Sequence, residues 1–208
     1  MRGCNMRIIG ITGGIGTGKS TILQVLEKEY GAYIIETDKL AHQLMLPGEQ
    51  AYNRIVAQFG DNILNEDNTI DRGKLGQIVF QNKNQLQQLN EIVHPAVKNF
   101  ILQDIDCKRR QEKVSYYVIE AALLIEDGYK AICDELWYIY ASKDTRIQRL
   151  LSGRGGTKEK WLQVISNQSS EEFYRMHCDV IIDNDGSVEK TSTLIKESLY
   201  SSQKCVTI

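Results

Sequence analysis

The amino-acid sequence predicts an α/β fold, a parallel β-sheet flanked by helices. Short runs rich in β-branched and aromatic residues recur along the 208 residues, and segments with helical periodicity separate them. A glycine-dense loop directly follows the first run and leads into the first helical segment. Strands that alternate with helices are typical of parallel sheets with crossover helices on their faces. The length suits one sizeable core, so we expect a single domain over residues 1–208.

The predicted elements follow in order along the chain. A β-branched run at 7–12 predicts a buried strand, and apolar residues spaced three and four apart at 20–31 predict the next helix. Residues 32–36 predict a second strand, and Asp38 is the candidate N-cap of the helix that follows it. The same criteria predict strands at 114–119, 135–141 and 179–183 and helices at 38–45, 143–151 and 187–200.

Residues 49–111 differ from the rest because they are polar and almost entirely helical in pattern. His94-Pro95 falls within them, and we expect it at a helix junction because proline disfavours helical backbone in the residue before it. No flexible linker flanks the stretch. We therefore expect a helical lobe within the domain, inserted into a core formed by residues 6–48 and 112–200.

The glycine-dense loop matches the phosphate-binding pattern G-x-x-x-x-G-K-[ST], from Gly13 to Ser20. Glycines let several backbone N–H groups approach one anion, and the N-terminus of the following helix adds further N–H groups. Lys19 would bring a positive charge to the terminal phosphates, and Ser20 a hydroxyl to Mg²⁺. The sequence thus predicts a P-loop NTPase-type fold whose residues for binding a nucleoside triphosphate such as ATP include Gly14, Ile15, Gly16, Thr17, Gly18, Lys19, Ser20 and Thr21.

Three classes of protein use such a loop: switch GTPases, remodelling ATPases and small-molecule kinases. A GTPase needs a guanine-reading N-K-x-D string, and the nearest string, NKNQ at 82–85, lacks the aspartate. A remodelling ATPase usually takes an arginine from a neighbouring subunit, whereas this chain carries arginines of its own after the fourth strand. A kinase is therefore favoured, and a nucleotide-gated regulatory switch is the non-enzyme alternative.

Several charged residues fit the needs of phosphoryl transfer. Arg149 and Arg154 flank a glycine-containing segment, and we expect residues 149–175 to form a lid that brings both cations to the transferred phosphate. Asp38 follows the second strand, where a carboxylate could accept the proton of the attacking hydroxyl. Glu120 ends the third strand and is a candidate to hold Mg²⁺ through water.

Composition argues against several other classes of protein. A net charge of −2 gives no reason to expect binding to nucleic acid or a membrane surface, and no apolar run approaches the ~18 residues of a membrane span. The five cysteines form no C-x-x-C pair, which fits reduced thiols in the cytoplasm better than disulfides or a zinc site. No obligate protein partner is evident.

The motifs taken together resemble the dephospho-coenzyme A kinase family over residues 6–200. The resemblance rests on GITGGIGTGKST at 10–21, Asp38-x-x-Ala41 with Pro47-Gly48, Ile70-Asp71-Arg72 with Leu75 and Phe80, His94-Pro95, ALLIE at 122–126, Arg149 with Arg154, and Asp183-Asn184-x-Gly186. It implies ATP-dependent phosphorylation of the ribose 3′-hydroxyl of dephospho-CoA, which yields ADP and coenzyme A. Periodicity and composition alone leave open a nucleoside or nucleotide kinase of similar architecture.

The resemblance also implies roles for individual residues. Asp38 would be the base at the ribose hydroxyl, Arg72 and His94 would border the acceptor, and residues 49–111 would form the CoA-binding lobe. Asn184 and Gly186 would border the adenine of ATP. The chain departs from the common family pattern at His42, Ala122, Ser170 and Tyr174.

Overall fold

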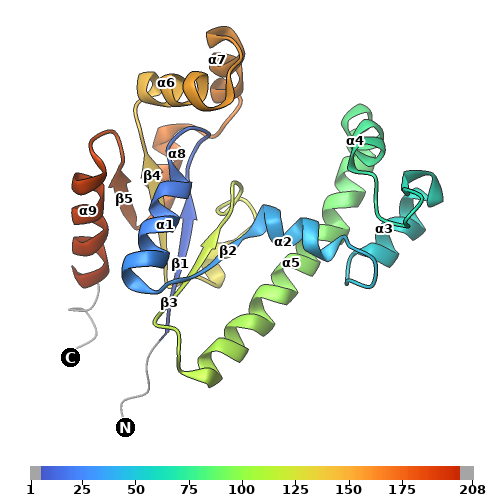
Figure 1. Ribbon diagram of the computed structural model, residues 1–208, viewed down its shortest axis with the longest axis horizontal. Coiled ribbons are helices and arrows are strands. Elements are labelled where there is room, and N and C mark those ends of the chain that lie inside the picture. Colours follow the sequence, from blue (N-terminus) through green and yellow to red (C-terminus); the bar gives the residue numbers. More distant parts are fainter. Residues whose placement is uncertain (1–5, 202–208) are drawn as a thin grey trace. The chain divides into compact units, whose positions relative to one another are not determined.

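A computed structural model of the protein describes residues 6–201. It contains a five-stranded sheet with the order β2-β3-β1-β4-β5 (Figure 1). The pairs β1–β3, β1–β4 and β4–β5 are parallel, which confirms the predicted type of sheet. The strands are β1 (Arg7–Thr12), β2 (Tyr33–Glu36), β3 (Tyr116–Glu120), β4 (Glu135–Tyr140) and β5 (Val180–Asp183).

Helices connect these strands and make up most of the remaining described residues. Two short 3-10 helices, η1 (Asp61–Ile63) and η2 (Tyr129–Ala131), accompany them. The α-helices are α1 (Lys19–Tyr30), α2 (Thr37–Leu44), α3 (Tyr52–Phe59), α4 (Arg72–Gln81), α5 (Lys83–Gln111), α6 (Lys143–Arg154), α7 (Lys158–Ser166), α8 (Glu171–His177) and α9 (Val188–Ser201).

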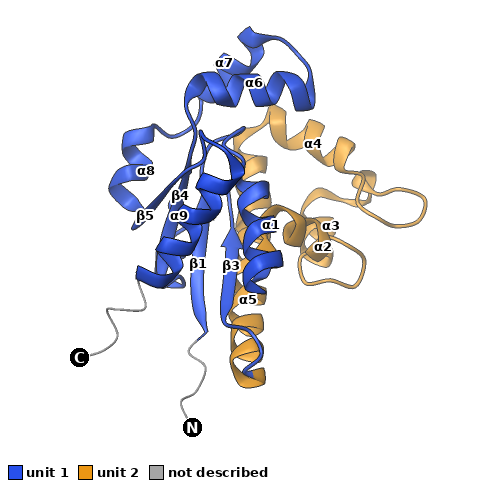
Figure 2. Ribbon diagram, turned by 60° about the vertical axis from the view of Figure 1, so that its left-hand side comes forward, with its two compact units in different colours: residues 1–34, 112–208 blue, residues 35–111 orange. Residues whose placement is uncertain are grey.

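The chain divides into two compact units (Figure 2). The first contains the residues up to 34 and those from 112 onward, so it is built from two separate stretches of sequence. The second contains residues 35–111. This second unit begins earlier than the lobe expected from residue 49, because it includes α2 as well as α3, α4 and α5.

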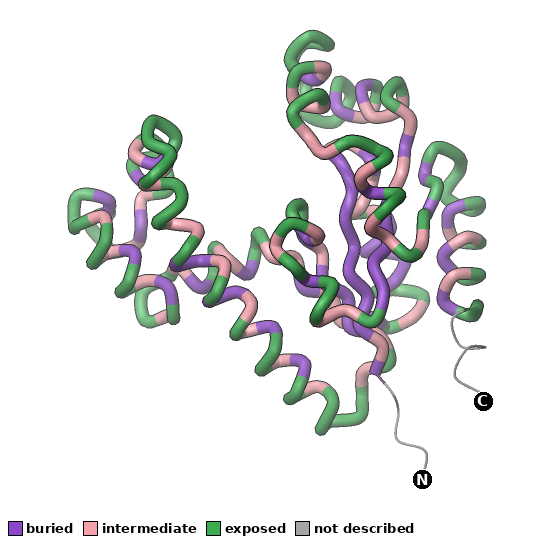
Figure 3. The backbone as a smooth tube through the Cα atoms, turned by 180° about the vertical axis from the view of Figure 1, so that it is seen from behind, coloured by how far each residue is buried: buried purple, intermediate pink, exposed green. Residues whose placement is uncertain are grey.

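The core of the first unit forms where β1 lies between β3 and β4. Each central strand is buried along most of its length (Figure 3), as expected for parallel strands covered on both faces. The helices α1 and α9 pack one face of the sheet with their apolar stripes, and Trp137 is fully buried beneath them. This packing fixes the end of β1, where the glycine-dense loop begins.

The second unit is organised around α5, which is 29 residues long and packs against α2 and α4. Pro95 lies inside this helix, so the expectation of a helix junction at His94-Pro95 is wrong. A proline in a helix interior removes one backbone hydrogen bond and usually kinks or breaks the helix. Here the cost is offset by a continuous buried stripe on both sides of the proline, which comprises Ile92, Val93, Ala96, Val97, Ile101 and Ile105.

Three further helical features differ from the sequence-based expectations. Glu36 is the N-cap residue of α2 and Asp38 lies in the first turn without a capping hydrogen bond, so Asp38 is not the N-cap. The helix α6 continues beyond its predicted end at residue 151, through Gly153 to Arg154. The helices α7 and α8 follow α6 in a segment for which the sequence pattern predicts no helix.

No helix within residues 6–201 has the length and hydropathy that a bilayer span requires.

Candidate nucleotide-binding site

The glycine-dense loop joins the end of β1 to the start of α1. At two positions its backbone conformation and the surrounding space require glycine. Gly13 has φ 151° and lies so close to β4 that a Cβ atom would come within 2.6 Å of the Ile139 carbonyl oxygen. Gly18 has φ 88° in the left-handed region and precedes the first residue of α1. The glycines therefore shape the loop as the sequence pattern requires.

The carbonyl groups of the loop are held by side chains, while several of its N–H groups are left open. The oxygens of Gly13, Gly14, Ile15 and Thr17 each accept at least one side-chain hydrogen bond. Within the described part of the chain, no acceptor meets the backbone N–H groups of Gly16, Gly18, Lys19 and Ser20. Free N–H groups that converge at a helix N-terminus form an anion-binding cradle.

Lys19 and Glu120 form an ion pair beside the cradle. The ammonium group of Lys19 donates to the Gly13 carbonyl at 2.9 Å and lies 3.5 Å from a carboxylate oxygen of Glu120. Glu120 ends β3 and stands beside Ile11 of β1 in the sheet, which brings it to this position. Both side chains are over four-fifths buried, so their interaction is only weakly screened by solvent. Ser20 lies exposed in the first turn of α1.

Arg149 and Asn184 reach the loop from two different elements. Arg149 of α6 donates to the carbonyl of Thr17 at 3.2 Å and to the carbonyl of Asn184 at 2.7 Å. The buried side chain of Asn184, directly after β5, donates to the same Thr17 carbonyl at 2.8 Å and accepts from the Thr191 hydroxyl at 3.0 Å. Asn184 therefore ties the loop to α9, and Gly186 lies two residues further along the β5–α9 connection.

A third set of contacts was not found by sequence reasoning. Arg146 of α6 donates through Nε to the Ile15 carbonyl at 2.8 Å and through a terminal nitrogen to Gln168 Oε1 at 2.6 Å. The same Gln168 oxygen accepts from the Ile15 N–H at 3.0 Å, which closes a three-residue network around the tip of the loop. Gln168 lies in the connection between α7 and α8, and no motif in the sequence marks it.

An aromatic pair supports this network. Tyr174 of α8, one of the departures from the family pattern, is buried and stacks on Tyr138 of β4 with ring centroids 4.7 Å apart. Burial raises the pKa of Tyr138 to about 12, so the phenol stays neutral. Burial also lowers the pKa of Arg146 from its ordinary value, although a guanidinium remains charged near pH 7. The guanidinium is thus held in a largely desolvated position beside the loop.

A sequence model of the dephospho-CoA kinase family matches residues 7–190.

The chain belongs to the dephospho-CoA kinase family.

A dephospho-CoA kinase from Carboxydothermus hydrogenoformans is 39% identical over 184 residues, which is 88% of each chain. One from Shouchella clausii is 37% identical over 92% of this chain and 96% of its own length.

Solved structures show the same relationship. A dephospho-CoA kinase from Campylobacter jejuni superposes with a TM-score of 0.69 at 26% identity, over 94% of this chain and 98% of its own. A shikimate kinase from Acinetobacter baumannii superposes with a TM-score of 0.54 at 13% identity, over 96% of both chains. The second likeness shows only that the fold is shared with another P-loop kinase.

The remaining residues expected from the resemblance to dephospho-CoA kinases belong to other parts of the structure. Arg154 is exposed at the last residue of α6 and makes no hydrogen bond or ion pair with other described residues. Asp38, Arg72 and His94 belong to the second unit. Asp38 and Arg72 are exposed in the first turns of α2 and α4, and neither has a hydrogen bond or ion pair among residues 6–201. His94 is half-buried on α5.

Proposed function

We propose that the protein transfers the γ-phosphate of ATP to the 3′-hydroxyl of the dephospho-CoA ribose, giving ADP and coenzyme A. The observation that supports this proposal is a glycine-dense loop whose carbonyl groups accept hydrogen bonds from the side chains of Lys19, Arg149 and Asn184. The loop lies in a chain that belongs to this kinase family. A loop backbone held in this way would present its free N–H groups to the triphosphate, and such preorganised donors are what electrostatic catalysis of phosphoryl transfer requires.

The nucleotide side of the reaction follows from the geometry of the loop. The open N–H groups would bind the β- and γ-phosphates, and the ammonium group of Lys19 would leave the Gly13 carbonyl to neutralise charge that builds up on the γ-phosphate. Arg149, already at the Thr17 carbonyl, would add a second cation, and Arg154 would join it through movement of a lid formed by residues 149–175.

The residues near the loop also fit Mg²⁺. Magnesium prefers oxygen ligands and is usually held by the substrate phosphates, water and one or two protein groups. The exposed hydroxyl of Ser20 and the carboxylate of Glu120 are such groups, and both belong to the first unit with the loop. Mg²⁺ would neutralise phosphate charge during the transfer. The proposed direct ligand is Ser20, and Glu120 would act through water.

The acceptor side is assigned to the second unit. Asp38 offers an exposed carboxylate in the first turn of α2, free of ion pairs with other described residues, and would take the proton of the ribose hydroxyl. Arg72 offers an exposed guanidinium that would bind the diphosphate of dephospho-CoA, and His94 would border the acceptor. Residues 49–111 would then form most of the CoA-binding lobe.

We also place the reaction in the cytoplasm. The cysteines among residues 6–201, Cys107, Cys133 and Cys178, are all free thiols. Free thiols on a chain that consumes ATP fit a reducing compartment.

One experiment tests the proposed activity against the closest alternative. The protein would be incubated with Mg-ATP and, in separate reactions, with dephospho-CoA, adenosine, AMP, CMP or uridine, while release of ADP is followed. We expect turnover with dephospho-CoA and little with the other acceptors. Turnover with a nucleoside or monophosphate and none with dephospho-CoA would refute the proposal and assign a nucleoside or nucleotide kinase instead.

A further inference from the structure

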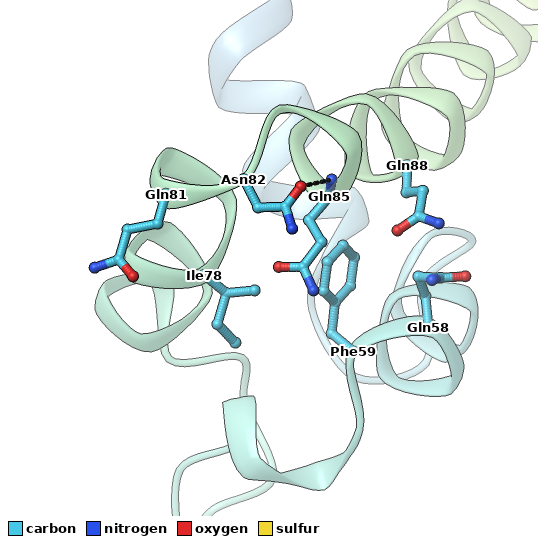
Figure 4. Close-up of a pocket in the computed structure, with 7 residues that line it drawn as sticks. All are labelled: Gln58, Phe59, Ile78, Gln81, Asn82, Gln85 and Gln88. Carbon is cyan, nitrogen blue, oxygen red and sulfur yellow. Dashed lines mark hydrogen bonds between the residues drawn. The ribbon is translucent and has the colours of Figure 1, made fainter.

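A hollow of about 510 Å³ lies within the second unit, where the end of α3, the end of α4 and the start of α5 meet (Figure 4). Its volume falls in the range of ~300–1,000 Å³ that is usual for small-molecule sites. Gln85 and Phe59 lie side by side near its middle, with Gln58 and Gln88 on one side and Ile78 on the other (Figure 4). The hollow lies within the proposed CoA-binding lobe, and none of the residues given an individual role above lines it.

The lining has an unusual chemical composition. Two of the side chains are apolar, Phe59 and Ile78. All the others are carboxamides: Gln58, Gln81, Asn82, Gln85 and Gln88. The lining contains no ionisable side chain, so the hollow suits a neutral ligand much better than a phosphate or a carboxylate.

The carboxamide side chains around the hollow differ in whether they already make hydrogen bonds within the protein. The Asn82 side-chain oxygen accepts from the backbone N–H groups of Asn84 and Gln85, at 2.9 and 3.3 Å, and so caps the start of α5. The side-chain amides of the four glutamines make no hydrogen bond to any residue in the described range 6–201. Each has both a donor and an acceptor available, and this pair of functions is complementary to another amide.

We propose that this hollow binds the pantetheine arm of the acceptor, an inference that rests on the proposed function. The arm is uncharged and carries two amides, a hydroxyl and a pair of geminal methyl groups. Its amides would pair with Gln58 and Gln85, and its methyl groups would contact Phe59 and Ile78. The diphosphate and the adenosine would lie outside the hollow, because nothing in the lining can neutralise their charge.

The test compares two acceptors that differ only in the arm. Dephospho-CoA and the methyl ester of adenosine 5′-diphosphate carry the same ribose and an equally charged diphosphate, but the ester has no pantetheine. We expect the double variant Gln58→Ala/Gln85→Ala to lower kcat/KM for dephospho-CoA about tenfold and to change kcat/KM for the ester less than twofold. Gln88→Trp, which fills the hollow instead of removing a hydrogen bond, should show the same selective loss.

Gln77→Ala is the matched control, because Gln77 is an exposed glutamine of α4 that does not line the hollow. It should leave both acceptors unaffected. If the variants lose activity equally on both acceptors, or on neither, the pantetheine assignment is wrong while the kinase assignment stands. If the wild-type protein phosphorylates neither acceptor, the proposed function itself is refuted, and the pocket assignment with it.

Discussion

Replacing Arg146 with methionine should impair the use of ATP without unfolding the protein. Methionine keeps much of the apolar length of the side chain but removes the guanidinium that bonds the Ile15 carbonyl at 2.8 Å and Gln168 at 2.6 Å. Gln168 can still accept from the Ile15 N–H, so the main loss is the anchor on the Ile15 carbonyl at the tip of the loop. The loop would then sample positions in which its N–H groups no longer converge.

The size of the effect follows from the bond that is lost. A hydrogen bond from a charged donor contributes about 1.5–3 kcal/mol, and a factor of ten in rate corresponds to about 1.4 kcal/mol. If the lost hydrogen bond contributes about 2 kcal/mol to holding the loop in its binding conformation, kcat/KM for ATP should fall roughly 30-fold in Arg146→Met. The KM for the acceptor should not change, because the contacts of Arg146 are to the nucleotide loop and to Gln168.

Steady-state kinetics on Arg146→Met, Gln168→Leu and the double variant would measure this. The two residues bond each other as well as the same loop residue, so the loss in the double variant should be smaller than the two single losses combined. Arg175→Met is the control, because Arg175 is an exposed arginine of α8 paired with Glu171 and should contribute little. A loss of less than threefold in kcat/KM for ATP, or additive effects in the double variant, would refute the positioning role.

Three other predictions concern the reacting groups and the thiols. Lys19→Ala should lower kcat at least 100-fold at saturating ATP because a cation beside the γ-phosphate is lost, and a variant with wild-type kcat would contradict the role given to Lys19. Asp38→Asn should lower kcat strongly while the Kd for ATP, measured by calorimetry, changes little. A raised Kd with an unchanged kcat would instead make Asp38 a nucleotide-binding or structural residue. Burial raises the pKa of Cys133 and Cys178 to about 12, so at pH 8 both stay protonated, and iodoacetamide should modify exposed Cys107 faster than either of them, as measured by mass spectrometry. Equal rates at Cys107, Cys133 and Cys178 would show that these two partly buried thiols are reached by solvent.

The sequence was most informative where local pattern and covalent geometry decide the structure. Gly13 and Gly18 could be assigned because the loop pattern marks both positions, and their backbone conformations are ones that favour glycine. The strands were found within two residues at each end, since β-branched runs mark buried strands. Pro95 was misplaced because a local rule about proline takes no account of the buried stripe that continues α5 through it.

Long-range pairings could not be predicted in the same way. Gln168 meets Ile15 across 153 positions of sequence, and nothing in the residues around Gln168 distinguishes it from a surface glutamine. The pairing of Asn184 with Thr17 was missed as well, although Asn184 itself was named through a family motif. Such contacts depend on how α6, α8 and β5 are packed, and packing is a property of the whole chain.

The position of β1 in the sheet has a consequence for synthesis of the protein. β1 leaves the ribosome well before its partners β3 and β4, which begin only at residues 116 and 135. At about 5–20 residues per second, an apolar strand waits roughly 5–20 s before either partner has been made. The helices of residues 35–111 are complete before that time. Slow translation across this stretch would therefore prolong the exposure of β1 to chaperones and to aggregation.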